Sequence, residues 1–434
     1  MDSSNRDVFG FGDLEALAAS VRESDVPEVE DGEEGSGHAL DVDTKSTATV
    51  EPEEAPIVRI AKVIIQRMII ENADTALISA YANCMNVRYR INGSWHEVMR
   101  LRKYCHPPVV SRFKIMAGMN IAERKVPQRG KIHIRHAGKD YDLLCQTMPT
   151  ASGERFAISV INRDTLRIGI GALGLTKELH QRLLGLANGH SGLLLVCGND
   201  DMGIHSTMYS LLRAADEPEA MIATIEDPVL MAVDNWSQTY VDRTQGLTIG
   251  VGLKYLAGLS PDIVMASLMP GIEVAEAALG LAHHAFVVGR APGDSIEKIL
   301  SLYGEYFGSG FLLPSLCGVL RRSVIRLNCQ ECASEYRPDD RLAAALGISE
   351  GADSTNCRRG VGCEVCRFCG YRESRGVYEY APVTREVYQV MTSRCGLDHA
   401  IARELGAQTA QAQIRALVAS GEASVEEGLR ALRM

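Results

Sequence analysis

The stretch GLLLVCGNDDMGIHSTMY, residues 192–209, is the segment around which the rest of the chain is organised. Its apolar run, Leu193 to Val196, enters a polar loop bounded by glycines, and a helix-like run from Ser206 to Leu212 follows. Strand, loop and helix in this order form the frame of a phosphate-binding loop. The frame therefore predicts a nucleotide-site fold.

The side chains that such a loop needs are missing. Against the pattern G-x-x-x-x-G-K-[ST], Ile204 replaces the lysine and His205 replaces the magnesium-binding hydroxyl. Asp200 and Asp201 also lie in the loop, where each carboxylate would repel a triphosphate by roughly 1 kcal/mol or more. We interpret as a vestigial nucleotide loop the residues Gly198, Asp201, Gly203, Ile204, His205, Ser206 and Thr207.

Length and composition are those of a soluble globular protein of two or three domains. The chain has 434 residues, of which 46% are hydrophobic and 23% charged. Its sequence contains neither an apolar run long enough to span a membrane nor a secretory signal pattern. We therefore expect a cytoplasmic protein without direct membrane insertion. Its twelve cysteines then favour thiols or a metal site over disulfides.

The negative charge is concentrated in residues 1–55. They hold 16 acidic and 3 basic residues, a net of −13, so the rest of the chain carries about +3 of the total −10. This composition predicts disorder, and the nearly neutral remainder gives no signal for nucleic-acid binding. Leu14, Leu17 and Val21 would form an apolar stripe on a short helix, which is either a frayed turn or a peptide that docks on a partner.

The order of apolar, polar and cysteine-rich stretches divides the remaining chain into four segments. Residues 56–165 resemble a small α/β domain, with a hairpin expected over 131–135 and 141–147. Residues 166–325 contain short apolar strands separated by helical segments, which predicts a parallel sheet covered on both faces. Residues 326–376 are rich in cysteine, and residues 377–434 are expected to be helical.

The cysteine pattern is the strongest chemical signal in the chain. Cys329-x-x-Cys332 and Cys363-x-x-Cys366, with 30 residues between them, can supply four thiolates to a tetrahedral zinc ion. Free thiols are the alternative, and Cys357 and Cys369 lie close enough to compete as ligands. We interpret as buried apolar residues the remaining cysteines, Cys84, Cys105, Cys145, Cys197, Cys317 and Cys395.

A pair of carboxylates, Glu226 and Asp227, follows an apolar strand at the sheet edge where such folds place ligands. The pair is either a remnant acidic box for Mg²⁺ or water, or a cap and turn contact. Without a lysine to hold a phosphate, the second interpretation is favoured. His205 and the pair His283-His284 are likewise expected to cap or pack rather than to bind a ligand.

Several motifs, in unbroken order over residues 57–395, resemble the GspE/PilB-type ATPases of type II secretion and type IV pilus assembly. They are Met116–Glu123, Pro127-Gln128, Met148–Glu154, Ile225–Val229, Pro261-Asp262, Glu273–Glu276, Gly362–Cys366 with Gly370-Tyr371, and Gly376–Glu379. The resemblance implies a small α/β (PAS-like) domain, a RecA-like P-loop core, a four-cysteine zinc insert, a helical C-terminal tail and a hexameric ring.

The departures from the family remove the charges that phosphoryl transfer requires. The family's functional side chains are replaced at Ile204 and His205 (Walker A), Ser267 and Leu268 (Walker B), and Leu144 and Ser159 (two arginines of the N-terminal domain). One of two family histidines corresponds to His283 or His284, the other is lost, and Glu226 and Asp227 remain. Losing these groups together, while the fold-defining glycines and strands persist, predicts a pseudo-ATPase and leaves ATP with Mg²⁺ a doubtful ligand.

We therefore expect a subunit that acts through assembly, in a ring with homologous subunits or with itself, or on an inner-membrane platform protein. That position would make it peripheral at the inner membrane. One alternative is an active ATPase with a divergent site that borrows basic residues such as Arg129, Lys131 or Arg155. The other is a free-standing regulatory binding module.

Overall fold

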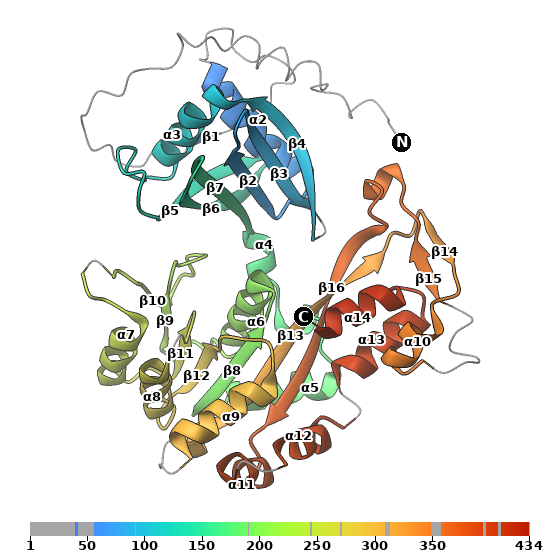
Figure 1. Ribbon diagram of the computed structural model, residues 1–434. Helices are drawn as coiled ribbons and strands as arrows, with labels where there is room; N and C mark the ends of the chain where they lie inside the picture. Colours follow the sequence, from blue (N-terminus) through green and yellow to red (C-terminus); the bar gives the residue numbers. More distant parts are fainter. Residues whose placement is uncertain are drawn as a thin grey trace. The chain divides into compact units, whose positions relative to one another are not determined.

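The computed structural model describes residues 40–41, 56–91, 93–189, 191–243, 245–269, 271–308, 313–348, 357–393, 396–406 and 409–433. The chain divides into two compact units, of which the first ends at Arg163 and the second begins at Asp164 (Figure 1). The docking helix predicted within residues 1–55 lies outside the described residues. The finer division into five segments remains a prediction.

The first unit is a seven-stranded sheet with two helices packed on it. Across the sheet the strands run β1 (Leu40–Asp41), β5 (Gln128–His136), β6 (Lys139–Thr150), β7 (Gly153–Asn162), β2 (Thr75–Ala80), β3 (Cys84–Ile91) and β4 (Ser94–Arg102). Helices α2 (Pro56–Ile70) and α3 (His106–Met116) bury their apolar faces against it. The predicted hairpin is the antiparallel pair β5–β6.

The sheet of the second unit is mixed. Its order is β10 (Ser237–Tyr240), β9 (Ile222–Glu226), β11 (Ile263–Ala266), β12 (Phe286–Arg290), β8 (Gly192–Gly198), β13 (Leu316–Asn328) and β16 (Tyr371–Pro382). The strands from β10 to β13 are parallel, and only β13 and β16 pair antiparallel. Strand β12 therefore separates β8, which leads into the quoted loop, from β11.

Helices cover both faces of the parallel part (Figure 1). One face is covered by α7 (Ile249–Leu256), α8 (Ile272–Leu281) and α9 (Ile296–Phe307), which form an apolar cluster with Leu193 and Leu195. Because successive strand residues point to opposite faces, Leu194 and Val196 lie on the other face of the sheet. Helix α6 (Asp201–Ala214) also contacts the sheet, and α5 (Lys177–Ala187) packs beside it. This burial on two faces explains why β8 is apolar at successive positions.

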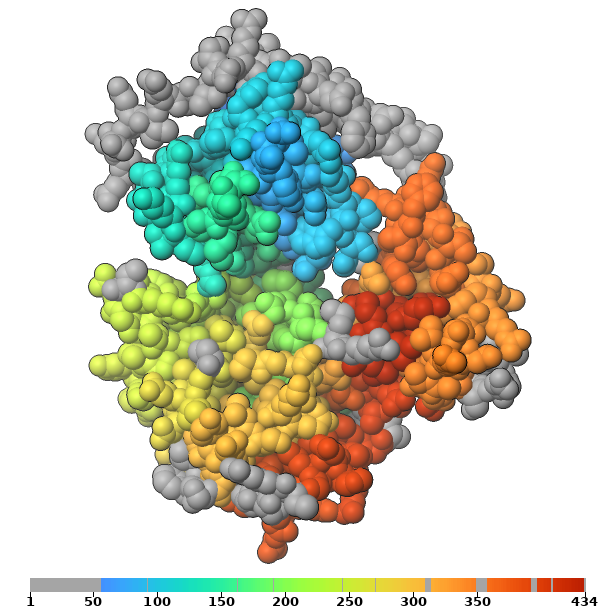
Figure 2. All heavy atoms as spheres, in the orientation of Figure 1, coloured from blue at the N-terminus to red at the C-terminus, as the bar shows by residue number. Residues whose placement is uncertain are grey.

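Strands β13 and β16 form a long ribbon that continues beyond the parallel strands to a smaller lobe (Figure 1). In the space-filling view the residues of this lobe are orange and red (Figure 2). The lobe has its own apolar core, in which Ile325 and Val377 of the ribbon pack against its helices. Its elements are β14 (Ala333–Glu335), β15 (Arg358–Gly360), α10 (Asp340–Leu346), α13 (Ala410–Ala419) and α14 (Val425–Arg433). Helices α11 (Arg385–Ser393) and α12 (Leu397–Leu405) lie between the ribbon and α13 in the chain. In the part of the chain that the structure describes, no helix has the length and apolarity needed to cross a bilayer.

A buried ion pair joins α14 to the ribbon. The carboxylate of Glu427 has no solvent exposure and lies 2.6 Å from Nη2 of Arg326 and 2.5 Å from Nη2 of Arg430. The backbone N–H of Arg326 also donates to it, at 2.9 Å. Because a buried charge without its partners is costly, this carboxylate fixes where α14 docks.

Removing this buried charge should destabilise the protein. Glu427→Gln leaves Arg326 and Arg430 without their counter-charge, and we expect the free energy of unfolding to fall by about 3 kcal/mol. The exposed pair Arg375–Glu422, 2.7 Å long, supplies the matched control, since Glu422→Gln should cost about 0.5 kcal/mol or less. Denaturant unfolding measures both, and equal losses would contradict the role given to Glu427.

Candidate functional site

The loop after β8 is much shorter than the sequence suggests. Helix α6 begins at Asp201, so only Asn199 and Asp200 separate it from Gly198. The prediction of a helix beginning at Ser206 is therefore wrong by five residues. Asp200 is the physical reason, because its carboxylate accepts a hydrogen bond from the N–H of Gly203, at 3.3 Å, and caps the helix.

A largely buried arginine holds this cap in place. Arg322 of β13 donates from Nη1 to the Asp200 carboxylate and from Nε to the hydroxyl of Tyr378, the latter at 3.0 Å. The guanidinium passes so close to Gly203 that a Cβ there would overlap it. Position 203 must therefore be a glycine because Arg322 lies against it, and binding of an anion is not needed to explain this residue.

The hydrogen bonds close into a ring around the first turn of α6. The hydroxyl of Thr207 lies 3.2 Å from that of Tyr378 and donates to the carbonyl oxygen of Gly203, at 2.8 Å. The ring therefore runs from Asp200 through Arg322 and Tyr378 to Thr207 and on to Gly203. It closes where the N–H of Gly203 donates back to the Asp200 carboxylate. The positive end of a helix normally attracts anions, and here the protein's own carboxylate occupies it.

The other side chains of the predicted loop are engaged within the fold. Ile204, at the position of the Walker lysine, is fully buried. His205 lies with Nδ1 2.8 Å from the carbonyl oxygen of Asp201, one helical turn earlier, and desolvation lowers the pKa of its imidazole. Ser206 donates to the carbonyl oxygen of Thr165 at 2.5 Å. Asp201 is largely exposed and pairs with Arg290, also at 2.5 Å.

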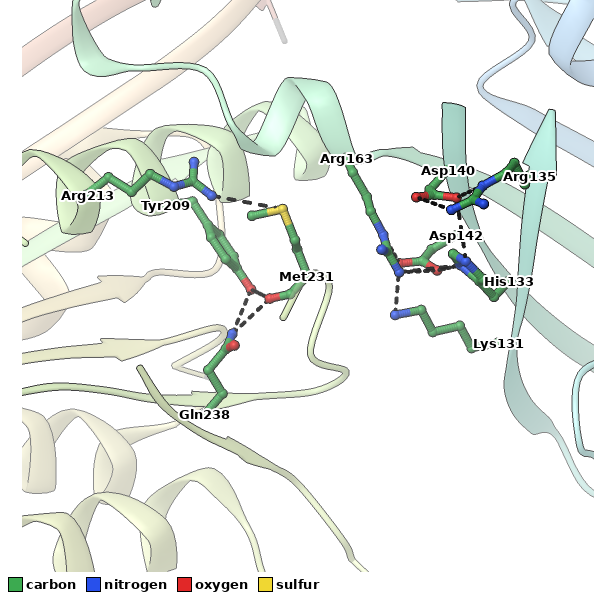
Figure 3. Close-up of polar contacts among 10 residues, drawn as sticks. All are labelled: Lys131, His133, Arg135, Asp140, Asp142, Arg163, Tyr209, Arg213, Met231 and Gln238. Carbon is green, nitrogen blue, oxygen red and sulfur yellow. Dashed lines mark hydrogen bonds and ion pairs between the residues drawn. The ribbon is translucent and has the colours of Figure 1, made fainter. Parts of the chain in front are cut away.

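Glu226 ends β9 as a fully buried carboxylate. It accepts hydrogen bonds from Tyr209 at 2.6 Å, Thr224 at 2.7 Å and Gln238 at 3.1 Å. Tyr209 and Gln238 also bond the carbonyl oxygen of Met231 (Figure 3). Burial raises the pKa of Glu226, against the lowering effect of the hydrogen bonds that it accepts. The residue thus ties α6 to β9 and β10 and caps no helix.

Asp227 makes the turn contact that its sequence context favours. Its N–H donates to the hydroxyl of Ser267, at 3.0 Å, and its carboxylate lies 3.0 Å from Nη2 of Arg243. Ser267 stands directly after β11, at a position where the family has a Walker B residue, and is itself buried. His283 contacts the hydroxyl of Ser315 at 3.1 Å, a packing contact near the start of β12.

Three basic side chains of the first unit gather around one buried carboxylate. Asp142 lies 3.0 Å from Nζ of Lys131, 2.9 Å from Nδ1 of His133 and 2.9 Å from Nε of Arg163 (Figure 3). Leu144 lies two residues along β6 from Asp142 and pairs in register with Lys131 on one side and Ser159 on the other. Lys131 is therefore already bound within its own unit.

The structure brings together the four cysteines of the predicted metal site. Their sulfur atoms all lie within 4.8 Å of one another, with Cys329–Cys363 at 3.9 Å, Cys332–Cys366 at 3.8 Å and Cys363–Cys366 at 3.7 Å. A tetrahedron with metal–sulfur bonds of about 2.3 Å has edges of about 3.8 Å. Backbone N–H groups of Cys363 and Gly370 point at the Cys366 sulfur, 3.2 and 3.3 Å away. The cluster fits a tetrahedral metal ion.

The two competing cysteines are outside this cluster. Cys369 donates to the carbonyl oxygens of Cys366 and Tyr371, at 2.8 and 3.1 Å. Cys357 packs in the apolar core of the lobe beside α10 and α13. The ribbon supplies the reason for the arrangement, because Cys329 follows β13 directly and Cys363 and Cys366 shortly precede β16.

With this geometry in view, the comparisons with known proteins are decisive. The family model "Type II/IV secretion system protein" matches residues 50–430. The chain belongs to this family. It is 30% identical over 375 residues to type II secretion system protein E of Pseudomonas aeruginosa, covering 86% of this chain and 70% of the relative. To type II secretion system ATPase E of Vibrio cholerae it is 28% identical, covering 87% and 76%.

Solved structures confirm the fold of this secretion-family chain. The ATPase DotB of Yersinia pseudotuberculosis superposes with a TM-score of 0.61 at 11% identity, covering 91% of this chain and 98% of that one. The pilus retraction motor PilT with bound ADP gives 0.57 at 14% identity, covering 86% and 96%. At such identities the likeness concerns the fold alone. The predicted RecA-like core, preceded by a small α/β domain and followed by C-terminal helices, is confirmed.

Sequence reasoning missed the residues that close the loop. Arg322 lies 122 positions after Asp200 and Tyr378 follows later still, so no local pattern connects them to α6. The local signal is the adjacent pair Arg321 and Arg322, which directly follows the apolar residues Val319 and Leu320. Consecutive strand residues face opposite sides of a sheet, so one of two adjacent arginines had to face each side.

Metal content tests the cysteine cluster. We expect about one zinc ion per chain, and Cys332→Ser should lose it, together with thermal stability, because one of four ligands is gone. Cys369→Ser is the matched control, since that thiol bonds only backbone carbonyls among the contacts described. Retention of zinc by Cys332→Ser, or its loss from both variants alike, would contradict the ligand assignment.

The raised pKa of Glu226 predicts a pH-dependent stability. Above about pH 4.3, its unfolded value, the unfolded chain releases the proton while the folded chain retains it. The free energy of unfolding should therefore fall as pH rises through the folded pKa. Glu226→Gln should be less stable than the wild type at low pH, because the NH2 group of its amide would face a hydrogen-bond donor. Its free energy of unfolding should, however, lack the fall with rising pH. Denaturation of both proteins over a pH series measures the difference, and parallel curves would contradict it.

Proposed function

We propose that the chain is a catalytically degenerate subunit of a type II secretion or type IV pilus assembly motor, and that it acts through protein–protein assembly. Its relatives in the family include type II secretion system proteins and an ATPase. The observation that carries the proposal is the carboxylate of Asp200, which occupies the N-terminus of α6 and is held there by Arg322.

This cap opposes nucleotide binding in two ways. A triphosphate would have to displace Asp200 from the Gly203 N–H and would meet negative charge at the place where an anion should bind. No lysine would then balance the phosphate charge, because Ile204 is packed into the core. Phosphoryl transfer depends almost entirely on such positioned charges, so their loss removes both binding and catalysis.

The remaining buried groups support a retained shape. Glu226 no longer faces a magnesium site but joins three secondary-structure elements. The four-cysteine cluster fits zinc, which would stabilise the lobe at the end of the β13–β16 ribbon. A retained shape without nucleotide chemistry suits a protein that joins a ring of homologous subunits, or of itself, on the cytoplasmic side of an inner-membrane platform protein.

An active ATPase with a divergent site is the second candidate. Arg290 and Arg322 bring two guanidinium groups to the first turn of α6, where a phosphate would lie. If Asp201 and Asp200 moved aside, both cations would become available to a nucleotide. This candidate requires measurable binding of ATP with Mg²⁺, whereas the first does not allow it.

Equilibrium binding of a fluorescent ATP analogue with Mg²⁺ separates the two. The wild type should not bind at millimolar nucleotide, while type II secretion system ATPase E of Vibrio cholerae serves as the positive control. Ile204→Lys/His205→Ser with Asp200→Gly should recover weak binding, whereas the same pair with Asp201→Gly should not. The melting temperature of each variant shows whether it has folded, since the side chain at position 204 lies in the core and a lysine there would have to be accommodated.

Two results would refute the proposal. Micromolar binding by the wild type would mean that other residues replace the missing lysine. Equal recovery with Asp201→Gly would mean that the cap by Asp200 is not what excludes the nucleotide.

A further inference from the structure

The sheet of the first unit has one edge that can accept a further strand. Strand β5 pairs with β6 at nine consecutive positions without a register shift, so its other side presents a regular row of backbone N–H and C=O groups. The opposite edge differs, because β4 has a bulge between Glu97 and Met99, where its pairing with β3 shifts register. A bulge twists an edge strand and hinders further pairing. The β5 edge is therefore the place where this sheet can grow.

A short strand from the N-terminal part of the chain already pairs with this edge. Strand β1 runs parallel to β5, with Leu40 opposite Ile134 and Asp41 opposite Arg135. Among the residues that the structure describes, no other strand pairs with β5 on that side. The pairing therefore contributes few hydrogen bonds, and a strand held by so few can open without unfolding of the sheet.

The outer face of β5 is basic. Ile132 and Ile134 are buried in the apolar core of the first unit, so strand periodicity turns the odd-numbered residues of β5 to the other face. From 129 to 135 these residues are Arg129, Lys131, His133 and Arg135. Strand β5 itself contains no carboxylate.

The carboxylates beside this face neutralise it only in part. Asp140 lies 2.9 Å from Nε of Arg135, and Asp142 belongs to the basic cluster described above (Figure 3). When Arg129 and Arg163 are counted, four cations stand against two carboxylates while the histidine is neutral. The edge therefore has a positive surplus that an acidic strand can balance.

The N-terminal segment has the opposite charge. Residues 1–55 hold 16 acidic and 3 basic residues, and Asp41 is the register partner of Arg135. Basic side chains deter pairing between this edge and the same edge of a second copy, because like charges would be opposed. The same side chains attract an acidic strand. The charge of the β5 edge thus favours the N-terminal segment over another copy of the edge.

We propose that the β5 edge is a strand-acceptor site, and that its occupant is the acidic N-terminal segment of the same chain, centred on Leu40 and Asp41. Main-chain hydrogen bonds supply the pairing, and charge selects the occupant. While it is bound, the segment closes the edge to strands of other proteins, and its release opens the edge. The proposal does not depend on whether the chain binds nucleotide.

Hydrogen exchange of the full-length protein, followed by peptide mass spectrometry, tests this pairing. Leu40→Pro/Asp41→Pro removes both N–H groups of β1, and amides within residues 134–136 should then exchange about tenfold faster, as expected for the loss of one or two hydrogen bonds. Thr47→Pro/Ala48→Pro is the matched control, because it places two prolines in the same segment outside the described pairing. It should leave the exchange of β5 unchanged, and β4 should exchange alike in all proteins.

The contribution of charge is tested by Asp41→Lys. This variant keeps the backbone N–H and reverses the charge opposite Arg135, so exchange within residues 134–136 should rise by a smaller factor. Added salt should speed the same exchange in the wild type and leave it unchanged in the double-proline variant. The melting temperature shows whether each variant is folded, and Asp41→Lys replaces the double-proline variant if that one is not.

A mixed sample separates pairing within one chain from pairing between copies. Unlabelled wild type is incubated with isotopically labelled double-proline variant, so that peptides of the two chains differ in mass. Pairing within the chain leaves β5 of the labelled chains unprotected. Protection gained by the labelled chains would overturn the proposal, because a second copy would then supply the strand. Equal exchange within residues 134–136 in the wild type and the folded double-proline variant, or the same loss in the control variant, would also overturn it.

Discussion

The cap that Asp200 places on helix α6 sets the length of the loop after β8 and ties that loop to the neighbouring strand β13. A helix N-terminus carries several N–H groups without partners inside the helix, and in a phosphate-binding loop an anion satisfies them. Here a carboxylate two residues beyond β8 fills that role, so the helix starts early and the loop shrinks. Arg322 of β13 then pairs with the carboxylate, and the hydroxyl of Tyr378 on β16 accepts a hydrogen bond from the same guanidinium.

Under the proposed function, the family fold persists although Ile204 and His205 replace the lysine and the hydroxyl of the phosphate-binding pattern. The sheet is maintained by strands buried on both faces and by internal polar contacts such as those of Glu226 and Glu427. Neither contact needs a ligand. The distal lobe is organised separately, by its own apolar core and by four thiols in tetrahedral spacing. Selection for assembly would therefore act on these features and not on the nucleotide loop.

Local sequence patterns predicted the central strand and the cysteine cluster, but not the start of α6 or the contact that holds its cap. The apolar run of β8 and the paired C-x-x-C units are predictable because both depend on residues close together in sequence. The start of α6 was missed because glycine spacing suggested a loop, although Asp200 three residues before Gly203 is itself a capping signal. The partnership of Asp200 with Arg322 depends on which strand lies beside β8, and that follows only from the folded sheet.

The central claim is that the first turn of α6 is closed by the protein itself. Amide hydrogen exchange of the segment around Gly203, with and without millimolar ATP and Mg²⁺, examines that turn directly. If Asp200 and Arg322 occupy the site, protection of the Gly203 amide should be the same in both conditions. A clear gain in protection on adding nucleotide would contradict the account, because it would mean that phosphate reaches the helix N-terminus.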